Sequence, residues 1–293
     1  MNLNTERLAK RASSLRIAAI TLAENMRNGS FKSLYRGQGI EFSDVREYLS
    51  GDNVRSIDWN VTARMGRPFI KQYEEDRELS VFLILDCSLS MRLGSSITRL
   101  DAAQEAAALL LLAAEQNSGA IGSVFFDGKI QFSCPPKAGR KNSLMILSKL
   151  DKIDSLQKSD GSALSNAITG AAKLLKKRSL VFILSDFRSA DWESPFARLA
   201  QKHDVVAVRI SDPSDMALPE IGTVPFYDIE SKKKSIFPTN SRRFKSAWRD
   251  ADQKRTEQWK DFCAKHGGFP LTLSTEEDAV TVLQRFFKQK ARL

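Results

Sequence analysis

Two short apolar runs, each followed by an aspartate, constrain the fold of this chain more than any other feature. Residues 80–85 lead into Asp86, and residues 180–184 lead through Ser185 into Asp186. Short runs rich in Val, Ile, Leu and Phe are typical of strands that are buried on both faces of a sheet. Such strands need helices on both faces, so the two runs predict an α/β domain.

Strand-like and helical segments alternate along the rest of the chain. Helices are expected near residues 98–117, 140–151, 163–177, 192–202, 240–266 and 276–289, and further strands near 121–126, 129–133, 205–210 and 269–273. Asp127-Gly128 favours a tight hairpin turn between two of these strands. Residues 222–240 are expected to be irregular or to form a hairpin insertion. The alternation predicts a mostly parallel, doubly wound sheet.

The first 79 residues differ in character from the remainder. Residues near 5–28 predict an amphipathic helix that packs on its own protein through one apolar stripe, formed by Leu8, Ala12, Leu15, Ala19, Leu22 and Met26. Several glycines punctuate residues 30–80, and residues 67–73 read as a short strand opened by Pro68. We therefore expect two parts, a helix with a small β-rich unit at 1–79 and an α/β domain at 80–293.

Composition narrows the class and location of the protein. Only three cysteines and two histidines occur in 293 residues, without CxxC spacing, which disfavours a structural zinc site and fits a reducing compartment. The longest apolar run, 106–114, is far shorter than the ~20 residues of a membrane span. We therefore expect a cytoplasmic protein. The net charge of +10 permits an acidic partner, nucleic acid or anionic lipid without choosing among them.

The side chains that follow the two strands form an all-oxygen set. Ligands collect outside the carboxyl ends of parallel strands, so Asp86 and Asp186 are expected to face one crevice. Ser88 and Ser90 follow Asp86 within one short turn, and Ser162 precedes a predicted helix at the same edge. These hard ligands suit Mg²⁺ or Mn²⁺ and disfavour zinc. We predict a metal ion here, with an open position that an incoming carboxylate would occupy.

Each of these residues also has a simpler interpretation. An aspartate after a strand is often a turn residue or a helix cap, and Ser88 or Ser90 could cap the helix that follows. The combination of all five residues at this spacing favours metal binding over these alternatives.

Asp86-x-Ser88-x-Ser90, with Ser162 and Asp186 later in the chain, resembles the metal-ion-dependent adhesion site of von Willebrand factor A-type domains. The resemblance covers about residues 80–290 and implies the fold of that family. It also implies that the three hydroxyls contact the metal and that the aspartates act directly or through water. A glutamate or aspartate of the ligand would complete the shell. Ser162 stands where the family usually has threonine, and the hydroxyl is kept.

A second resemblance runs almost from end to end of the chain. It is carried by Arg36-Gly-Gln-Gly-Ile-Glu-Phe, Asp44-Val-Arg46-Glu-Tyr48, Gly51-Asp52-x-x-Arg55-x-Ile-Asp58-Trp59, Thr62-Ala-Arg64, Leu218-Pro-x-x-Gly222 and Thr275-Glu-Glu. These segments resemble bacterial "domain of unknown function 58" proteins. Such proteins are generally linked with MoxR-type AAA+ ATPases, which implies an assembly or chaperone-like role with a partner of that kind.

The charge-rich segment 44–64 has two interpretations, a site or a salt-bridged clamp. Arginines and aspartates of alternating sign favour the clamp. Trp59 is expected to anchor the core of the small unit.

Two other functions compete with metal-bridged recognition. An enzyme is disfavoured, because Ser88 replaces the second aspartate of haloacid-dehalogenase-like phosphatases, and neither GxxxxGK[ST] nor GxGxxG occurs. The alternative is a basic surface that binds nucleic acid or peripheral anionic membrane. Its densest basic points, 232–234, 242–243 and 288–292, are scattered, which favours a solvated surface. Salt should weaken phosphate binding steeply, whereas a chelator should abolish metal-bridged binding.

Overall fold

The computed structural model describes residues 19–20, 22–24, 26, 39–49, 51–76, 80–153, 163–227 and 234–290. By their contacts, the described residues between Tyr35 and Glu78 form a small unit, and all other described residues form a larger one.

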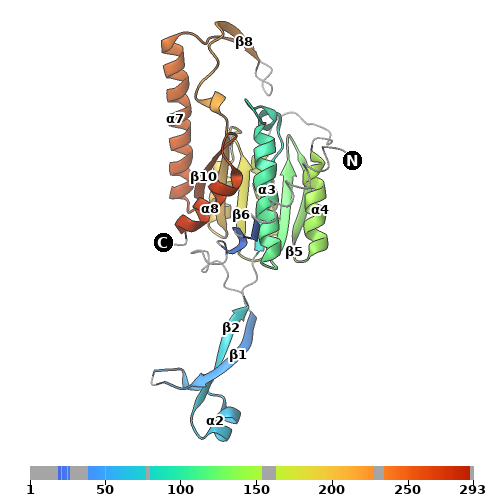
Figure 1. Cartoon of the computed structure of the whole chain (residues 1–293), viewed down its shortest axis with the longest axis vertical. Coiled ribbons are helices and arrows are strands. Elements are labelled where there is room, and N and C mark those ends of the chain that lie inside the picture. The colour runs from blue at the N-terminus through green and yellow to red at the C-terminus, as the bar shows by residue number, and fades with distance from the viewer. Residues whose placement is uncertain are drawn as a thin grey trace. The chain divides into compact units, whose positions relative to one another are not determined.

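The larger unit is built on a six-stranded sheet with the order β10-β7-β6-β3-β4-β5 (Figure 1). Neighbouring strands are parallel except at the β4–β5 pair. The strands are β3 (Ser80–Asp86), β4 (Ala120–Phe126), β5 (Ile130–Lys137), β6 (Leu180–Ser185), β7 (Asp204–Ser211) and β10 (Phe269–Ser274). Both edge strands contain proline, at Pro135 and Pro136 in β5 and at Pro270 in β10. After β3 the chain first builds outward to β4 and β5, then returns to the other side of β3 with β6.

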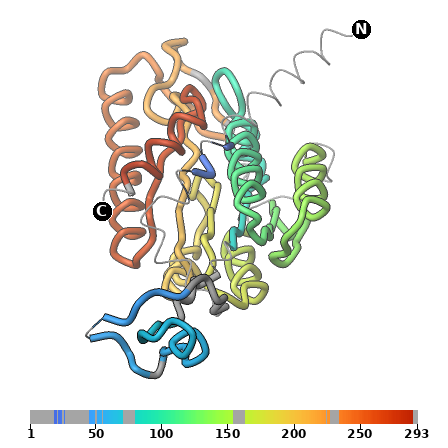
Figure 2. The backbone as a smooth tube through the Cα atoms, turned by 60° about the horizontal axis from the view of Figure 1, so that its bottom comes forward, coloured from blue at the N-terminus to red at the C-terminus, as the bar shows by residue number. Residues whose placement is uncertain are grey.

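Helices cover both faces of this sheet. They are α3 (Arg99–Gln116), α4 (Arg140–Asp151), α5 (Leu164–Leu174), α6 (Glu193–Ala200), α7 (Arg242–Lys265) and α8 (Ala279–Lys290). In Figure 2, α4 lies toward the β5 side of the unit and α7 toward the β10 side. Among the described residues, every helix is too short or too polar to traverse a bilayer.

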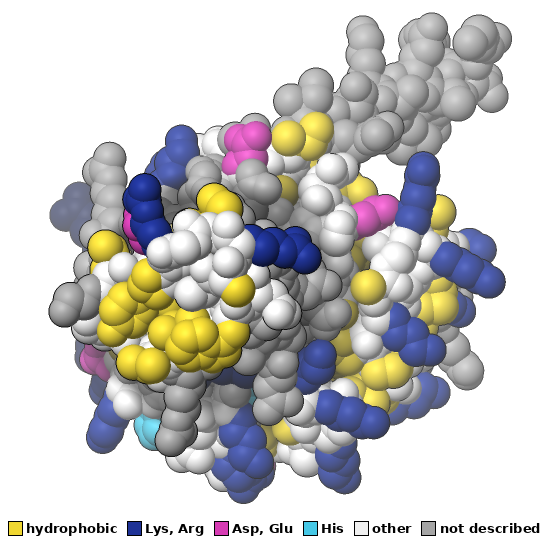
Figure 3. All heavy atoms as spheres, turned by 90° about the horizontal axis from the view of Figure 1, so that it is seen from below, with side chains coloured by type: hydrophobic (Ala, Val, Ile, Leu, Met, Phe, Trp, Pro, Cys, Tyr) yellow, Lys and Arg dark blue, Asp and Glu magenta, His cyan; other side chains and the backbone are white. Residues whose placement is uncertain are grey.

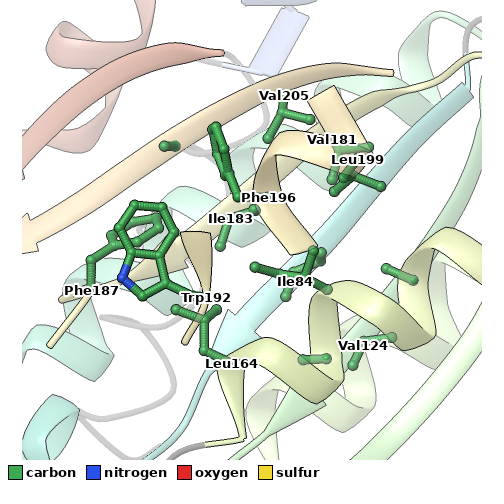
Figure 4. Close-up of a cluster of buried hydrophobic side chains, with 14 of the residues drawn as sticks. Ile84, Val124, Leu164, Val181, Ile183, Phe187, Trp192, Phe196, Leu199 and Val205 are labelled. Atoms are coloured by element: carbon green, nitrogen blue, oxygen red, sulfur yellow. The ribbon is translucent and has the colours of Figure 1, made fainter. Parts of the chain in front are cut away.

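One face of the sheet packs on α5, α6 and α7. Alternate residues of β3 and β6, such as Ile84 and Ile183, join Leu164 of α5 and Phe196 of α6 in one buried cluster (Figure 4). Trp192 packs edge-on against Phe196, with ring centroids 5.6 Å apart. Burying apolar area of this extent is the main stabilising contribution to the unit.

The opposite face packs on α3 and α8. Phe182 of β6 meets Phe287 of α8 with ring centroids 6.2 Å apart. The described residues of the predicted N-terminal helix also belong to this unit: Ala19, Leu22 and Met26 are buried. Asn117, at the end of α3, donates from Nδ2 to the carbonyl of Ala23 at 3.2 Å. These three stripe residues therefore pack on their own protein, as predicted, whereas Leu8, Ala12 and Leu15 lie outside the described residues.

The predicted α/β class and mostly parallel, doubly wound sheet are confirmed. The expected hairpin insertion is also present, as β8 (Thr223–Tyr227) and β9 (Lys234–Pro238), which pair antiparallel. Short 3₁₀ segments lie at Val54–Ser56, Leu89–Arg92 and Pro213–Asp215.

The small unit pairs β1 (Gly39–Glu47) antiparallel with β2 (Phe69–Asp76), and β2 begins directly after Pro68 as expected. Between the strands lies a helix that the sequence analysis missed, α2 (Trp59–Met65). Its signals were an N-cap and a C-terminal glycine. Asp58 accepts from the backbone N–H groups of Asn60 and Val61, and Gly66 ends the helix at φ 68°.

One ion pair lies within the charge-rich segment, where Arg46 binds both carboxylate oxygens of Asp52 at 2.7 Å. The role of the whole segment as a clamp stays a prediction. The role expected for Trp59 is wrong: its side chain is 68% exposed. Trp59 is the first residue of α2, directly after the cap, and no residue of this helix is buried.

Asp212 connects three loops at the carboxyl edge of the large sheet. Its carboxylate accepts hydrogen bonds from Ser95 after β3, from Ser214 after β7 and from Thr275 after β10. Burial alone would raise the pKa of this carboxyl, but the hydrogen bonds from Ser214 and Ser95 outweigh burial and lower it. Asp212 thereby fixes the loops that surround the ends of β3 and β7.

We expect Asp212→Asn to lower the free energy of unfolding at pH 7 by about 1–3 kcal/mol, because hydrogen bonds to a charged acceptor weaken. A folded pKa below the unfolded value of about 3.9 contributes stability above that value and loses it as pH falls further. Urea unfolding at pH 7, 4 and 2.5 should therefore show a shallower acid loss in Asp212→Asn than in wild type. Equal acid losses in the two proteins would contradict this role.

Candidate metal centre

Asp86 and Asp186 lie where the strand order reverses. The chain leaves β3 toward β4 on one side and leaves β6 toward β7 on the other, and ligands of α/β sheets usually bind at such a reversal of strand order. Leu85 is in register with Leu184, which sets Asp86 beside Ser185. The Ser185 hydroxyl donates to Oδ2 of Asp86 at 2.6 Å, and Asp186 is the next residue along the chain. The predicted meeting of the two strand ends is therefore present.

The turn after β3 brings two of the predicted hydroxyls beside Asp86. The backbone N–H of Ser88 donates to Oδ1 of Asp86 at 2.9 Å, which closes a tight turn. The Oγ atoms of Ser88 and Ser90 lie 3.2 Å apart. Asp86, Ser88 and Asp186 are buried, and Ser90 is partly exposed. Ser88 stands at the N-cap position of the 3₁₀ segment that follows, but its side chain makes no capping hydrogen bond there.

The two carboxylates repel each other in a poorly hydrated place. Burial raises the pKa of Asp86 most, and the charge of Asp186 raises it further, to about 7, against smaller opposing effects of hydrogen bonds from Ser185 and Ser88. Asp186 accepts from the backbone N–H of Arg188 through Oδ1 at 3.1 Å. Its buried Oδ2 has no hydrogen-bond partner among the described residues. The carboxylate pair thus has unused acceptor capacity at Asp186 Oδ2.

Ser162, the fifth predicted ligand, lies outside the described residues. The following residue is placed: the backbone N–H of Ala163 donates to the carbonyl of Asp127 at 2.6 Å. Asp127 directly follows β4, whose end pairs with Asp86 of β3. The start of α5 is thereby tied to the same carboxyl edge as Asp86 and Asp186.

The donor set fits a hard divalent cation. The described part of the chain holds no group of three or more His, Cys, Asp and Glu side chains suited to a metal. The set at this edge is of another kind, with carboxylates from Asp86 and Asp186 and hydroxyls from Ser88 and Ser90. A cation between the carboxylates would relieve their repulsion and provide Asp186 Oδ2 with a partner.

Sequence reasoning missed the cations around this edge. Arg188 Nε lies 3.8 Å from Asp186 Oδ2, and its guanidinium also pairs with Asp215. Arg99, buried at the start of α3, pairs with the same carboxylate of Asp215. Arg99 and Asp215 are 116 residues apart, so no local pattern could have revealed the pair. Arg188, two residues after Asp186, could have been considered from its position alone.

Residues 44–258 match the sequence profile of a family described as protein of unknown function DUF58. The chain belongs to the DUF58 family. This DUF58 protein is 29% identical to uncharacterized proteins of Mycobacterium tuberculosis and Mycobacterium bovis. Each alignment covers 97% of this chain and 90% of the relative. The predicted family is therefore confirmed.

Solved structures also resemble this DUF58 protein. BatB of Bacteroides thetaiotaomicron, a conserved hypothetical protein, is 17% identical with a TM-score of 0.50, covering 73% of this chain and all of its own. The VWA domain of SpRpn10 is 11% identical with a TM-score of 0.39, covering 70% of this chain and 93% of its own. The likeness to BatB, with the strand order above, confirms the von Willebrand factor A-like fold and shows the fold alone.

We expect Asp86→Asn to stabilise the metal-free DUF58 protein at neutral pH, because it removes one of two buried like charges. A carboxyl with its folded pKa raised to about 7 destabilises the fold increasingly as pH rises from about 4 to about 7. The advantage of Asp86→Asn over wild type should therefore grow across that window, by at most about 1.4 kcal/mol per pH unit.

Urea unfolding in the presence of a chelator, at pH 5, 6 and 7, measures this difference. Asp191→Asn is a matched control, since Asp191 is exposed, follows the same strand and has the left-handed φ of 62° that asparagine tolerates. A constant difference between Asp86→Asn and wild type over these pH values would show that the two carboxylates are not in conflict.

Proposed function

We propose that this DUF58 protein is a metal-dependent protein-interaction module rather than an enzyme. Its large unit would hold one Mg²⁺ or Mn²⁺ through Asp86, Ser88, Ser90, Ser162 and Asp186. An acidic side chain of a partner protein would complete the coordination shell. When bound, the ion supplies an electropositive centre that attracts a carboxylate; every other feature of recognition comes from the chain.

The carboxylate pair is the observation that carries this proposal. Two buried carboxylates at the ends of neighbouring strands conflict with each other unless a proton or a cation intervenes. Asp212, a carboxylate with a structural role at the same edge, differs from this pair because it accepts hydrogen bonds from three side chains. Asp186 Oδ2 has no such donor among the described residues, which supports a ligand role.

The preference for an acidic ligand follows from charge. The serines are neutral donors, so two carboxylates at most balance a +2 ion, and exchange of a metal-bound water for an anionic oxygen is favourable in a crevice less polar than water. Arg188 lies beside Asp186 with its side chain 36% exposed. It would add attraction for an approaching carboxylate.

A MoxR-type AAA+ ATPase is the partner class we propose, on the resemblance of the signature segments to the family. The role would be assembly or a chaperone-like task, in the cytoplasm. The three cysteines are free and buried, in keeping with a reducing compartment. Burial alone raises the pKa of Cys263 to about 12. That thiol therefore stays protonated and inert.

We expect wild type to bind one Mg²⁺ or Mn²⁺ per chain, and Asp86→Asn and Asp186→Asn each to weaken binding at least tenfold, because each loses an anionic ligand. Calorimetric titration measures the affinity and stoichiometry. Asp191→Asn, which removes an equal charge from the loop after β6, should bind as wild type does.

Ser162 provides a second control within the same titration. Ser162→Thr keeps the hydroxyl and should bind metal normally, whereas Ser162→Val removes the ligand and keeps the shape of threonine. Wild-type affinity in Asp86→Asn and Asp186→Asn would end the proposal of a metal site. Equal binding by the Thr and Val variants would remove Ser162 alone from it.

We expect a purified MoxR-type ATPase, captured on immobilised protein, to be released by a chelator and restored by Mg²⁺, because the contact runs through the metal. Asp86→Asn and Asp186→Asn, first shown to be folded, should fail to capture it. Retention through chelation and in both variants would show that recognition lies elsewhere. Release by salt with indifference to chelator would instead indicate the basic surface.

A further inference from the structure

Four large apolar side chains are exposed together in the small unit. Leu49, Val54, Trp59 and Met65 are 65%, 59%, 68% and 63% exposed. They lie in the turn after β1, in the 3₁₀ segment and at both ends of α2. Figure 3 shows hydrophobic side chains gathered in one patch of the surface that it views. We call these four residues the apolar face.

The carboxylates around the apolar face are hydrogen-bonded within the small unit itself, while the apolar side chains are exposed to solvent. Asp52 binds Arg46 through both oxygens and also accepts from the backbone N–H of Leu49 at 2.8 Å. Asp58 caps α2 and so fixes Trp59, the first residue of that helix. The charged side chains thus hold rigid the segments that carry the apolar ones outward.

The described side chains of this unit form little core to balance this exposure. Its described elements are one antiparallel strand pair, a 3₁₀ segment and one short helix without a buried residue. Ile70 is the one buried hydrophobic residue among the described side chains of this unit. A two-stranded hairpin is marginally stable in water by itself. Covering Trp59 and its neighbours would therefore contribute both stability and binding energy.

Among the described side chains around the apolar face, one arginine has no ion-pair partner. Arg67 pairs with Glu47 at 3.2 Å, and Arg46 pairs with Asp52. Arg64, one residue before Met65 in the exposed last turn of α2, has no ion-pair partner among the described residues. A ligand that covers Trp59 and Met65 would meet this guanidinium at its rim.

We propose that the apolar face is a docking surface for a protein segment that presents apolar side chains with a carboxylate beside them. Trp59 and Met65 receive the apolar side chains, and Arg64 pairs with the carboxylate. Aromatic residues, Met and Arg are the side chains enriched at protein–protein contacts, and Trp is frequent among those that dominate the binding energy. This surface belongs to the small unit and the candidate metal centre to the larger one, and the docking proposal does not rest on the metal.

The observations favour this occupant over two others. A protein surface that binds an anionic membrane typically carries a cluster of cations without carboxylates beside them. This face instead carries Glu47, Asp52 and Asp58 among its arginines. If a second copy docked through the same face, the described carboxylates that it brings to Arg64 would already be in use. In this face Glu47 and Asp52 are already paired, and Asp58 caps α2.

The test uses a phage-displayed library of random peptides as the probe, panned on the full chain without selection against any variant. The selected peptides should combine apolar residues with Asp or Glu. By fluorescence anisotropy, Trp59→Ser and Met65→Ser should weaken their binding at least tenfold. Arg64→Glu should also weaken it, and replacing the peptide carboxylates with lysine should restore binding to Arg64→Glu.

Ile236→Ser is the matched control, because Ile236 is 70% exposed in β9 of the larger unit. It should leave peptide binding unchanged. Peptides that bind Trp59→Ser as well as wild type, or that are insensitive to Arg64→Glu, would overturn the proposal. Trp59-dependent binding to phosphatidylcholine–phosphatidylserine vesicles, or Trp59-dependent dimerisation in sedimentation velocity, would replace it with a membrane or a second copy.

Discussion

The reversal of strand order at β3 and β6 is the constraint on which the chemistry of the large unit depends. Loops that leave adjacent parallel strands toward opposite sides make their strand ends the usual place for a ligand in α/β sheets. The register of Leu85 with Leu184 then sets Asp86 beside Ser185 and next to Asp186. The surrounding core is close-packed, so the two carboxylates cannot relax apart without a loss of apolar burial.

The carboxylates at this edge differ in how many hydrogen-bond donors and cations surround them. Asp212 and Asp215 are surrounded by hydroxyls, N–H groups or arginines, and they join loops that are distant in sequence. Asp86 and Asp186 receive fewer donors and face each other's charge. The fully hydrogen-bonded carboxylates, Asp212 and Asp215, make the edge rigid. That rigidity keeps the charges of Asp86 and Asp186 close together. A carboxyl with a raised pKa, as Asp86 has, is typical of functional sites.

The larger unit was predictable because its signals are local. The apolar runs before Asp86 and Asp186 and the periodic helices are each contained within a few residues, and the strand-end rule then brings distant segments together. The network of Arg99, Arg188 and Asp215 was not predictable, since its members meet only through tertiary packing.

The small unit shows where the same reasoning fails. The aspartate cap and terminal glycine of α2 were readable at Asp58 and Gly66, but they were not used. Trp59 was assigned to a core because large aromatic residues are usually buried, and composition cannot tell an interior from a contact surface. Ser162 lies outside the described residues, so its place at the site stays a prediction.

The prolines of the two edge strands restrict how this domain meets other proteins. Pro135 and Pro136 in β5, and Pro270 in β10, remove backbone donors from the strands that bound the sheet on either side. An incoming strand would find an incomplete ladder at both margins, so growth of the sheet by strand addition is suppressed, and with it edge-to-edge aggregation. Partner proteins would therefore be bound through side chains on the helices and on the loops beyond the strand ends, and not by strand addition.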